Sequence, residues 1–158
     1  MTTILFVESD DILRNAIHRA FKAECNIKVT LVMDTKQAKE VLDEQFFDLL
    51  VIDTVLKYDD TDGITFLKNI RKEGIYIPAC FYTPLSQEDV SEQMMGYNCL
   101  TVISNQIDPE GLVKIVKDML YISGEDGQVK LDELEELAQS LETKVKKFSK
   151  QARNINCI

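Results

Sequence analysis

FDLLVIDTVLKYDDTDG, residues Phe47 to Gly63, contains an unbroken apolar run that ends in a single carboxylate, that of Asp53. The run covers residues 49–52, which is too short for a typical helix and includes β-branched side chains. This pattern, followed by polar and loop-forming residues, is typical of a strand that is buried on both faces of a parallel sheet. Ligands of open parallel sheets bind beyond the carboxyl ends of the strands, where the strand order reverses. We therefore expect Asp53 to lie in a functional site.

Short apolar runs alternate with helical patterns over most of the chain. The runs predict strands at residues 3–8, 27–32, 49–52, 76–82 and 98–103. Apolar residues at helical spacing predict a helix after each strand, and capping or turn residues mark the helix starts near Asp10, Thr35, Gly63, Ser86 and Asp108. Parallel neighbouring strands need helical crossovers. The fold class is therefore α/β, a doubly wound five-stranded parallel sheet with the flavodoxin-like order 2-1-3-4-5.

A different pattern begins after a Gly- and acid-rich break at residues 123–130. Apolar residues recur beyond it at spacings of three and four, which is the heptad pattern of a coiled-coil helix. The members of this seam are Leu131, Leu134, Ala138, Leu141, Val145, Phe148, Ala152 and Ile155. We predict a domain over residues 1–122, a linker over 123–130 and a C-terminal heptad helix over 131–158. The helix either forms a homodimer through residues 131–155 or packs as an amphipathic helix on its own domain.

The composition restricts the classes of function. The 158-residue chain is 45% apolar, enough for a packed core, and carries a formal net charge of -9. Nucleic-acid binding depends mainly on Lys and Arg, so this acidic chain is not expected to bind nucleic acid. No apolar stretch approaches the roughly 20 residues that span a bilayer, and no signal-peptide pattern opens the chain. We expect a soluble, cytoplasmic protein without membrane association, in which Cys80 and Cys99 are reduced core residues.

Three carboxylates are expected to converge at one edge of the sheet. In the order 2-1-3-4-5 the first and third strands end side by side, which brings Glu8, Asp10 and Asp53 together. Clustered carboxylates raise one another's pKa unless a cation lies among them, and an oxygen-only pocket suits Mg²⁺. An Asp in such a pocket can act as a nucleophile toward a phosphoryl group. Thr83 ends the neighbouring strand, where its hydroxyl can donate to a phosphoryl oxygen.

Simpler interpretations exist for the same residues. An Asp at a strand end can be only a helix cap or a loop residue, and Thr83 can be only a turn residue before Pro84. Asp59, Asp60 and Asp62 are typical of solvated acids or caps rather than ligands.

Several short motifs occur in the order and spacing of a known family. They are ILFVESD at Ile4 to Asp10 with Arg14, DLLVID at Asp48 to Asp53, Ile77-Pro78 with Thr83, and Gly96. Together they resemble the receiver domain of two-component response regulators over residues 1–122. The resemblance rests on the combination, because none of these motifs is specific alone.

The resemblance implies a role for each matching residue. Asp53 aligns with the phosphoacceptor and Thr83 with the switch hydroxyl. Glu8 and Asp10 align with the acids of a Mg²⁺ pocket that Asp53 completes, and Val55 aligns with the residue that lends the metal its backbone carbonyl. The implied partners are a histidine kinase or phosphotransfer protein and a downstream protein that docks on the fourth helix and fifth strand. The implied function is signal transduction through protein–protein contacts.

The sequence also departs from the family pattern. Ser9 stands where the family usually has a metal-ligating Asp, which weakens Mg²⁺ binding. The loop from Asp53 to Gly63 is about two residues longer than the usual pattern and lacks its proline. Ile103 and Ser104 replace the usual phosphate-binding Lys and Pro, and Leu100 replaces an aromatic switch residue. Loss of the Lys removes a charge-assisted bond to the phosphoryl group, so phosphotransfer is expected to be slow or absent.

The sequence thus favours an atypical receiver in phosphorelay signalling that is not an enzyme. The alternative is a pseudo-receiver that binds partners without phosphorylation, for which Ser9 and the missing Lys argue. A further alternative is a small metal-dependent phosphohydrolase with Asp53 as nucleophile. Haloacid-dehalogenase-like enzymes carry a second Asp two residues after the nucleophile, where this chain has Val55.

Overall fold

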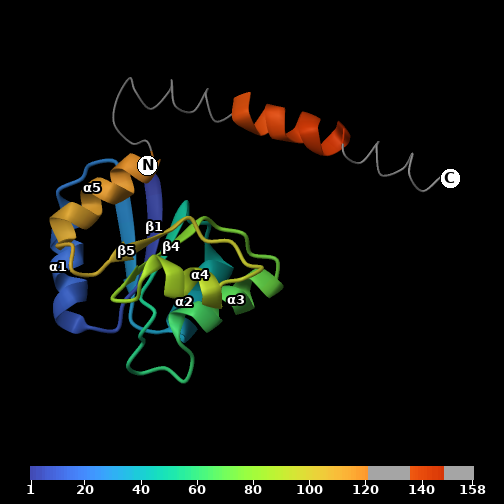
Figure 1. The fold of residues 1–158 in the computed structure, drawn as a ribbon. Helices are drawn as coiled ribbons and strands as arrows, with labels where there is room; N and C mark the ends of the chain where they lie inside the picture. The colour runs from blue at the N-terminus through green and yellow to red at the C-terminus, as the bar shows by residue number, and fades with distance from the viewer. Residues whose placement is uncertain (121–135, 148–158) are drawn as a thin grey trace. The chain divides into compact units, whose positions relative to one another are not determined.

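A single parallel sheet forms the centre of the computed structural model, which describes residues 1–120 and 136–147. Its five strands are arranged in the order β2-β1-β3-β4-β5 (Figure 1). They are β1 (Thr2–Val7), β2 (Ile27–Val32), β3 (Leu49–Ile52), β4 (Ala79–Thr83) and β5 (Thr101–Ser104). All four neighbouring pairs are parallel. The predicted α/β class and the strand order 2-1-3-4-5 are confirmed.

A helix follows each strand, as the alternating pattern predicted. The helices are α1 (Asp11–Lys22), α2 (Thr35–Glu44), α3 (Gly63–Lys72), α4 (Gln87–Gln93) and α5 (Pro109–Leu120). Four of them begin behind a side chain that accepts a hydrogen bond from the backbone three residues on, namely that of Asp10, Asp34, Asp62 or Ser86. Figure 1 shows α1 and the start of α5 on one face of the sheet and α2, α3 and α4 on the other. Helices on both faces make the sheet doubly wound.

The three central strands supply most of the core. Residues 4–7 of β1, 49–52 of β3 and 79–83 of β4 are all buried. Strand β2 lies at an edge of the sheet, and only its two end residues are buried. Runs without a polar residue therefore mark the strands that helices cover on both faces.

Two strands begin later than the apolar runs suggested. Strand β4 was expected from residue 76 but begins at Ala79, the partner of Leu50 in the ladder. Pro78 has no backbone N–H, and it takes part in the sheet only because its carbonyl accepts a bond from the Leu50 N–H at 2.8 Å. Strand β5 was expected from residue 98 but begins at Thr101, opposite Cys80. Each of these ladders starts one residue after the neighbouring strand begins, so an apolar run alone does not determine the first residue of the strand.

The C-terminal prediction lies mostly outside the described residues. Residues 136–147 are helical, and they include three members of the heptad seam, Ala138, Leu141 and Val145, which are exposed. The other seam residues fall within 121–135 and 148–158, as do the predicted domain boundary and linker. By itself, Met1–Lys114 forms one compact unit, and a second begins at Ile115, inside α5. The coiled coil, the homodimer and the domain boundaries remain predictions.

Gly63 allows a close approach between α3 and the end of β3. A Cβ atom at this position would lie 2.1 Å from the backbone oxygen of Asp53 and 2.8 Å from Cγ2 of Ile52. The N–H of Gly63 also donates to the backbone oxygen of Thr54 at 3.0 Å. Backbone atoms cannot move aside as a flexible side chain can, so only glycine fits here.

We predict that Gly63→Ala lowers the free energy of unfolding by roughly 1 to 3 kcal/mol, the usual cost of overpacking a rigid site. Urea denaturation followed by circular dichroism measures this change. Thr65→Ala, an exposed position on the same helix, is the control and should change stability far less. Equal stability of Gly63→Ala and wild type would contradict the close approach.

Candidate functional site

The carboxyl ends of β1 and β3 lie next to each other. Val7 pairs with Ile52 in the last step of their ladder. One residue further, the N–H of Asp53 donates to the backbone oxygen of Val7 at 3.0 Å, and the N–H of Glu8 donates to that of Val32 at 3.0 Å. The sheet thus places Glu8 and Asp53 beside each other, as predicted from the strand order. Both are buried, with 1% and 9% of their surface exposed.

The carboxyl groups of Glu8 and Asp53 interact unfavourably when both are ionised. Burial raises the pKa of Glu8 from its ordinary 4.5 to about 8, and the charge of Asp53 contributes in the same direction. Burial also raises the pKa of Asp53, although the N–H of Val55, which donates to its Oδ1 at 3.0 Å, favours the ionised form. Glu8 is therefore expected to keep its proton at neutral pH unless a cation binds.

One buried oxygen of Glu8 is available to such a cation. Oε2 of Glu8 is buried and has no hydrogen-bond partner in the part of the chain that the structure describes. Oε1 accepts from the N–H of Asp10 at 3.0 Å. A proton on Glu8 can bond to the Asp53 carboxylate, and a hard cation such as Mg²⁺ can bind both groups instead. The two carboxyls therefore fit a divalent cation.

Asp10 has a different position from that of the other two acids. Its Oδ1 caps α1 by accepting from the N–H of Leu13 at 2.9 Å, which lowers its pKa. Its Oδ2 lies 3.5 Å from Nζ of Lys57. Within residues 1–120 and 136–147, no group of three or more His, Cys, Asp or Glu side chains is arranged to hold a metal. Asp10 thus contacts Glu8 through its backbone N–H, while its carboxylate binds Leu13 and Lys57.

Lys57 is a residue of the site that the sequence analysis did not identify. It lies in the long loop between β3 and α3, and its N–H donates to Oγ of the buried Ser9 at 3.1 Å. Its ammonium group, besides approaching Asp10, favours the ionised form of Asp53. In the sequence, Lys57 could have been noticed as a basic residue in a long loop that is otherwise acidic.

Thr83 is buried at the end of β4. Its Oγ1 lies 2.6 Å from Oγ1 of Thr54, the residue after Asp53, and it accepts from the N–H of Leu85 at 3.2 Å. The Thr54 contact was not foreseen, although a second Thr directly after Asp53 was visible in the sequence. Thr83 therefore links the ends of β3 and β4 to the first residues before α4.

The remaining predicted positions surround this centre. Val55 is half exposed and contacts Asp53 through its N–H. Ser104 is opposite Thr83 in the β4–β5 ladder, and Ile103 is opposite Tyr82. Both side chains are uncharged, so neither supplies a positive charge to the site. Leu100 is exposed and precedes β5.

Other features fix the backbone around the site. Nη1 of Arg14 donates to the backbone oxygen of Glu8 at 2.8 Å. Among the loop acids, Asp62 caps α3, and Asp59 accepts from both the N–H and the hydroxyl of Thr35, at 2.7 and 3.0 Å. Asp62 is thus a helix cap, and Asp59 binds the first residue of α2. Both agree with the simpler interpretation, in which these acids are not ligands.

The chain is similar to known proteins in both sequence and structure. The family model described as "Response regulator receiver domain" matches residues 4–117. A curated protein of Porphyra purpurea named "Probable transcriptional regulator ycf29" is 27% identical over 122 residues, which are 75% of this chain and 56% of the relative. The chain thus covers little more than half the length of that relative.

Solved structures share the fold. The Francisella response regulator 1452 receiver domain has 26% identity and a TM-score of 0.64, covering 77% of this chain and 97% of the other. The chemotaxis response regulator CheY4 of Vibrio cholerae has 17% identity and a TM-score of 0.64, covering 75% and 98%. At that identity the second likeness concerns the fold alone.

None of the described helices has the length and apolar character needed to cross a bilayer.

We predict that stability falls as pH rises between about 5 and about 8 in metal-free buffer. In this window the unfolded chain has lost the Glu8 proton while the folded chain, with a pKa of about 8, keeps it, so folding is disfavoured as pH rises. Glu8→Gln should reduce this dependence to the part that comes from the raised pKa of Asp53, and should raise stability at pH 8 by roughly 1 to 4 kcal/mol, because a shift of one pKa unit corresponds to about 1.4 kcal/mol.

Urea denaturation at several pH values in the presence of a chelator tests this. Glu40→Gln, an exposed acid on α2, is the matched control and should keep the wild-type dependence. A wild-type stability that does not change over the window, or an equal slope in Glu8→Gln, would contradict the assignment.

Proposed function

Because this chain belongs to the response regulator receiver domain family, we propose that it acts in two-component signal transduction with Asp53 as its phosphoacceptor. The observation that supports this most is the buried pair of Glu8 and Asp53, whose pKa values are both raised and which leaves one oxygen of Glu8 unpartnered. The carboxylate of Asp53 in such a pocket can act as a nucleophile toward a phosphoryl group once a cation offsets the charge of its neighbour.

In the proposed reaction an oxygen of Asp53 attacks the phosphorus of a phosphohistidine on a histidine kinase or phosphotransfer protein. The new P–O bond forms as the P–N bond breaks, and the imidazole leaves with a proton from solvent. The N–H of Val55 orients the attacking carboxylate through its bond to Oδ1. Bound Mg²⁺, held by Glu8, Asp53, the carbonyl of Val55 and, once it is released from Lys57, Asp10, would neutralise the phosphoryl oxygens.

Lys57 is proposed to supply part of the positive charge that the family normally obtains elsewhere. The usual Lys is replaced by Ile103, and the usual third acid by Ser9. Nζ of Lys57, on a flexible and mostly exposed side chain, lies close to Asp10 and acts electrostatically on Asp53. A phosphoryl group on Asp53 would offer this ammonium a stronger partner than Asp10 does.

Thr83 is proposed to transmit the phosphorylation state. A phosphoryl oxygen would compete with Thr54 for the hydroxyl of Thr83. The N–H of Leu85 donates to Oγ1 of this same hydroxyl. Movement of Thr83 would therefore alter the start of α4. Helix α4 is in turn linked to β5, because Oε1 of Gln87 accepts from the N–H of Val102 at 3.2 Å. The signal is a shift in population of this face.

A downstream protein is proposed to dock on the surface of α4 and β5. Met95 and Leu100, both exposed apolar residues, lie beside these elements. Receiver domains are signalling modules in general, and we infer that this chain acts in the cytoplasm through protein contacts rather than as an enzyme. The word transcriptional in the relative's name describes that longer protein.

A phosphorylation-independent receiver is the second candidate. The observation that favours it is the fully buried hydroxyl pair of Thr83 and Thr54, which would have to separate before Thr83 reached a phosphoryl group. Ser9 and Ile103 point in the same direction, since both replace charged groups of the usual pocket.

We predict that wild type, incubated with Mg²⁺ and acetyl phosphate, gains one phosphoryl group, whereas Asp53→Asn gains none. In this reaction an Asp53 oxygen attacks phosphorus and acetate leaves. Intact mass spectrometry measures the gain. Absence of an adduct in wild type would favour the second candidate, and an adduct in both would locate the modification elsewhere.

We predict that Lys57→Gln slows this labelling roughly tenfold, because a charge-assisted hydrogen bond contributes on the order of 1.5 kcal/mol. Lys57→Arg should retain most of the rate. Lys28→Gln, which removes an exposed Lys from β2, controls for the change in net charge. An unchanged rate in Lys57→Gln would exclude Lys57 from the reaction.

A further inference from the structure

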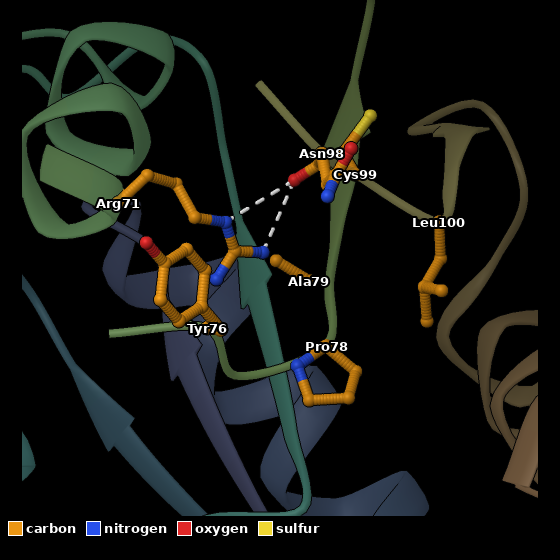
Figure 2. Close-up of a pocket in the computed structure, with 7 residues that line it drawn as sticks. All are labelled: Arg71, Tyr76, Pro78, Ala79, Asn98, Cys99 and Leu100. Atoms are coloured by element: carbon orange, nitrogen blue, oxygen red, sulfur yellow. Dashed lines mark hydrogen bonds between the residues drawn. The ribbon is translucent and has the colours of Figure 1, made fainter. Parts of the chain in front are cut away.

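A hollow of about 390 Å³ lies at the end of the sheet opposite to Asp53. Ala79 opens β4 there, and Leu100 directly precedes β5. Pro78, Cys99 and the ring of Tyr76 add further walls. Figure 2 shows these residues around the guanidinium group of Arg71, which projects from α3 toward their centre. The hollow thus combines mainly apolar walls with one cation.

Arg71 is buried without an acidic partner. Only 7% of it is exposed, and it makes three hydrogen bonds to carbonyl oxygens. Nε and Nη2 donate to that of Asn98 at 3.3 and 3.1 Å, and Nη1 donates to that of Ile75 at 2.9 Å. No ion pair of Arg71 occurs among the described residues. A guanidinium has five N–H donors and does not lose its charge, so two donors and a full positive charge remain.

The three carbonyl bonds alone account for the position of Arg71 but not for its charge. They hold together the segments that precede β4 and β5, which neutral donors could also do. A buried charge that has only neutral partners costs stability, and burial lowers the pKa of Arg71 accordingly. An anion in the hollow would offset this cost.

The surroundings are positive although the chain as a whole is acidic. Nζ of Lys68 and of Lys72 lie 5.8 and 5.9 Å from the ring centre of Tyr97. A smaller hollow of about 160 Å³ is lined by Lys72 and Tyr97 and shares Arg71 with the first. Glu73, the next acid in the chain, is 2.7 Å from Nζ of Lys39. The local field therefore attracts an anion toward Arg71.

We propose that this hollow binds a small organic carboxylate with an apolar, ring-sized body. The two free donors of Arg71 suit a carboxylate, which guanidinium groups bind through paired N–H bonds. The apolar body would pack on Tyr76, Pro78 and Leu100. The volume falls within the range of about 300 to 1,000 Å³ that is usual for small-molecule pockets. One guanidinium among apolar walls fits a monocarboxylate better than a phosphate.

The test uses the full chain and a defined probe, 3-phenylpropionate, with its uncharged amide as the matched control ligand. Titration of ¹⁵N-labelled protein should give saturable shifts at the amides of Ala79, Asn98 and Leu100. The amide ligand should bind at least tenfold more weakly. Absence of saturation, equal binding of both ligands, or shifts confined to other residues would overturn the proposal, and Arg71 would then be a structural clamp only.

Two variants of one exposed residue isolate the charge. Tyr76 is 75% exposed, so it can be replaced without loss of the core, and its ring lies beside the guanidinium of Arg71 in the hollow (Figure 2). Tyr76→Glu places a carboxylate beside the guanidinium, and Tyr76→Gln removes the same ring without adding charge. The probe should bind at least fivefold more weakly to Tyr76→Glu than to Tyr76→Gln. A ratio near one would overturn the proposal.

Discussion

The side-by-side arrangement of the Glu8 and Asp53 carboxyls is the constraint on which the rest of the site depends. It follows from the parallel pairing of β1 and β3, because both acids come one residue after the last ladder pair. Arg14 fixes the backbone oxygen of Glu8, and Gly63 lets α3 begin against the backbone of Asp53. Because the backbone fixes where these two side chains begin, a proton or a cation is what relieves the repulsion between them.

The fold was largely predictable because its signals are local. Unbroken apolar runs gave the central strands, and capping side chains gave the helix starts. The bounds of β2 (27–32) and β3 (49–52) agree with the sequence pattern to the residue. The starts of β4 and β5 were not predictable in the same way, because a ladder begins only where the neighbouring strand offers a partner. The sequence pattern therefore predicts a strand for the segment before Ala79, but this segment lies outside the ladder.

The site was predictable only as far as backbone topology decides it. Strand order alone placed Glu8 beside Asp53. Whether Asp10 turns its carboxylate toward them or caps α1 is a choice between competing partners, and the sequence contains both possibilities. The position of Lys57 depends on the path of a loop about two residues longer than usual, and no periodic pattern determines such a path. The sequence therefore does not determine which of several possible partners a polar side chain binds.

The two ends of the sheet pose the same physical problem with opposite signs. At the carboxyl ends, Glu8 and Asp53 are buried with too little positive charge around them. At the amino ends, Arg71 is buried, and its hydrogen-bond partners within the described residues are neutral carbonyl oxygens. In the two proposed sites, a cation at the carboxyl ends and an anion at the amino ends would each stabilise the folded chain in proportion to its binding. The sign of the charge at each end is the basis for the chemical class of ligand proposed there.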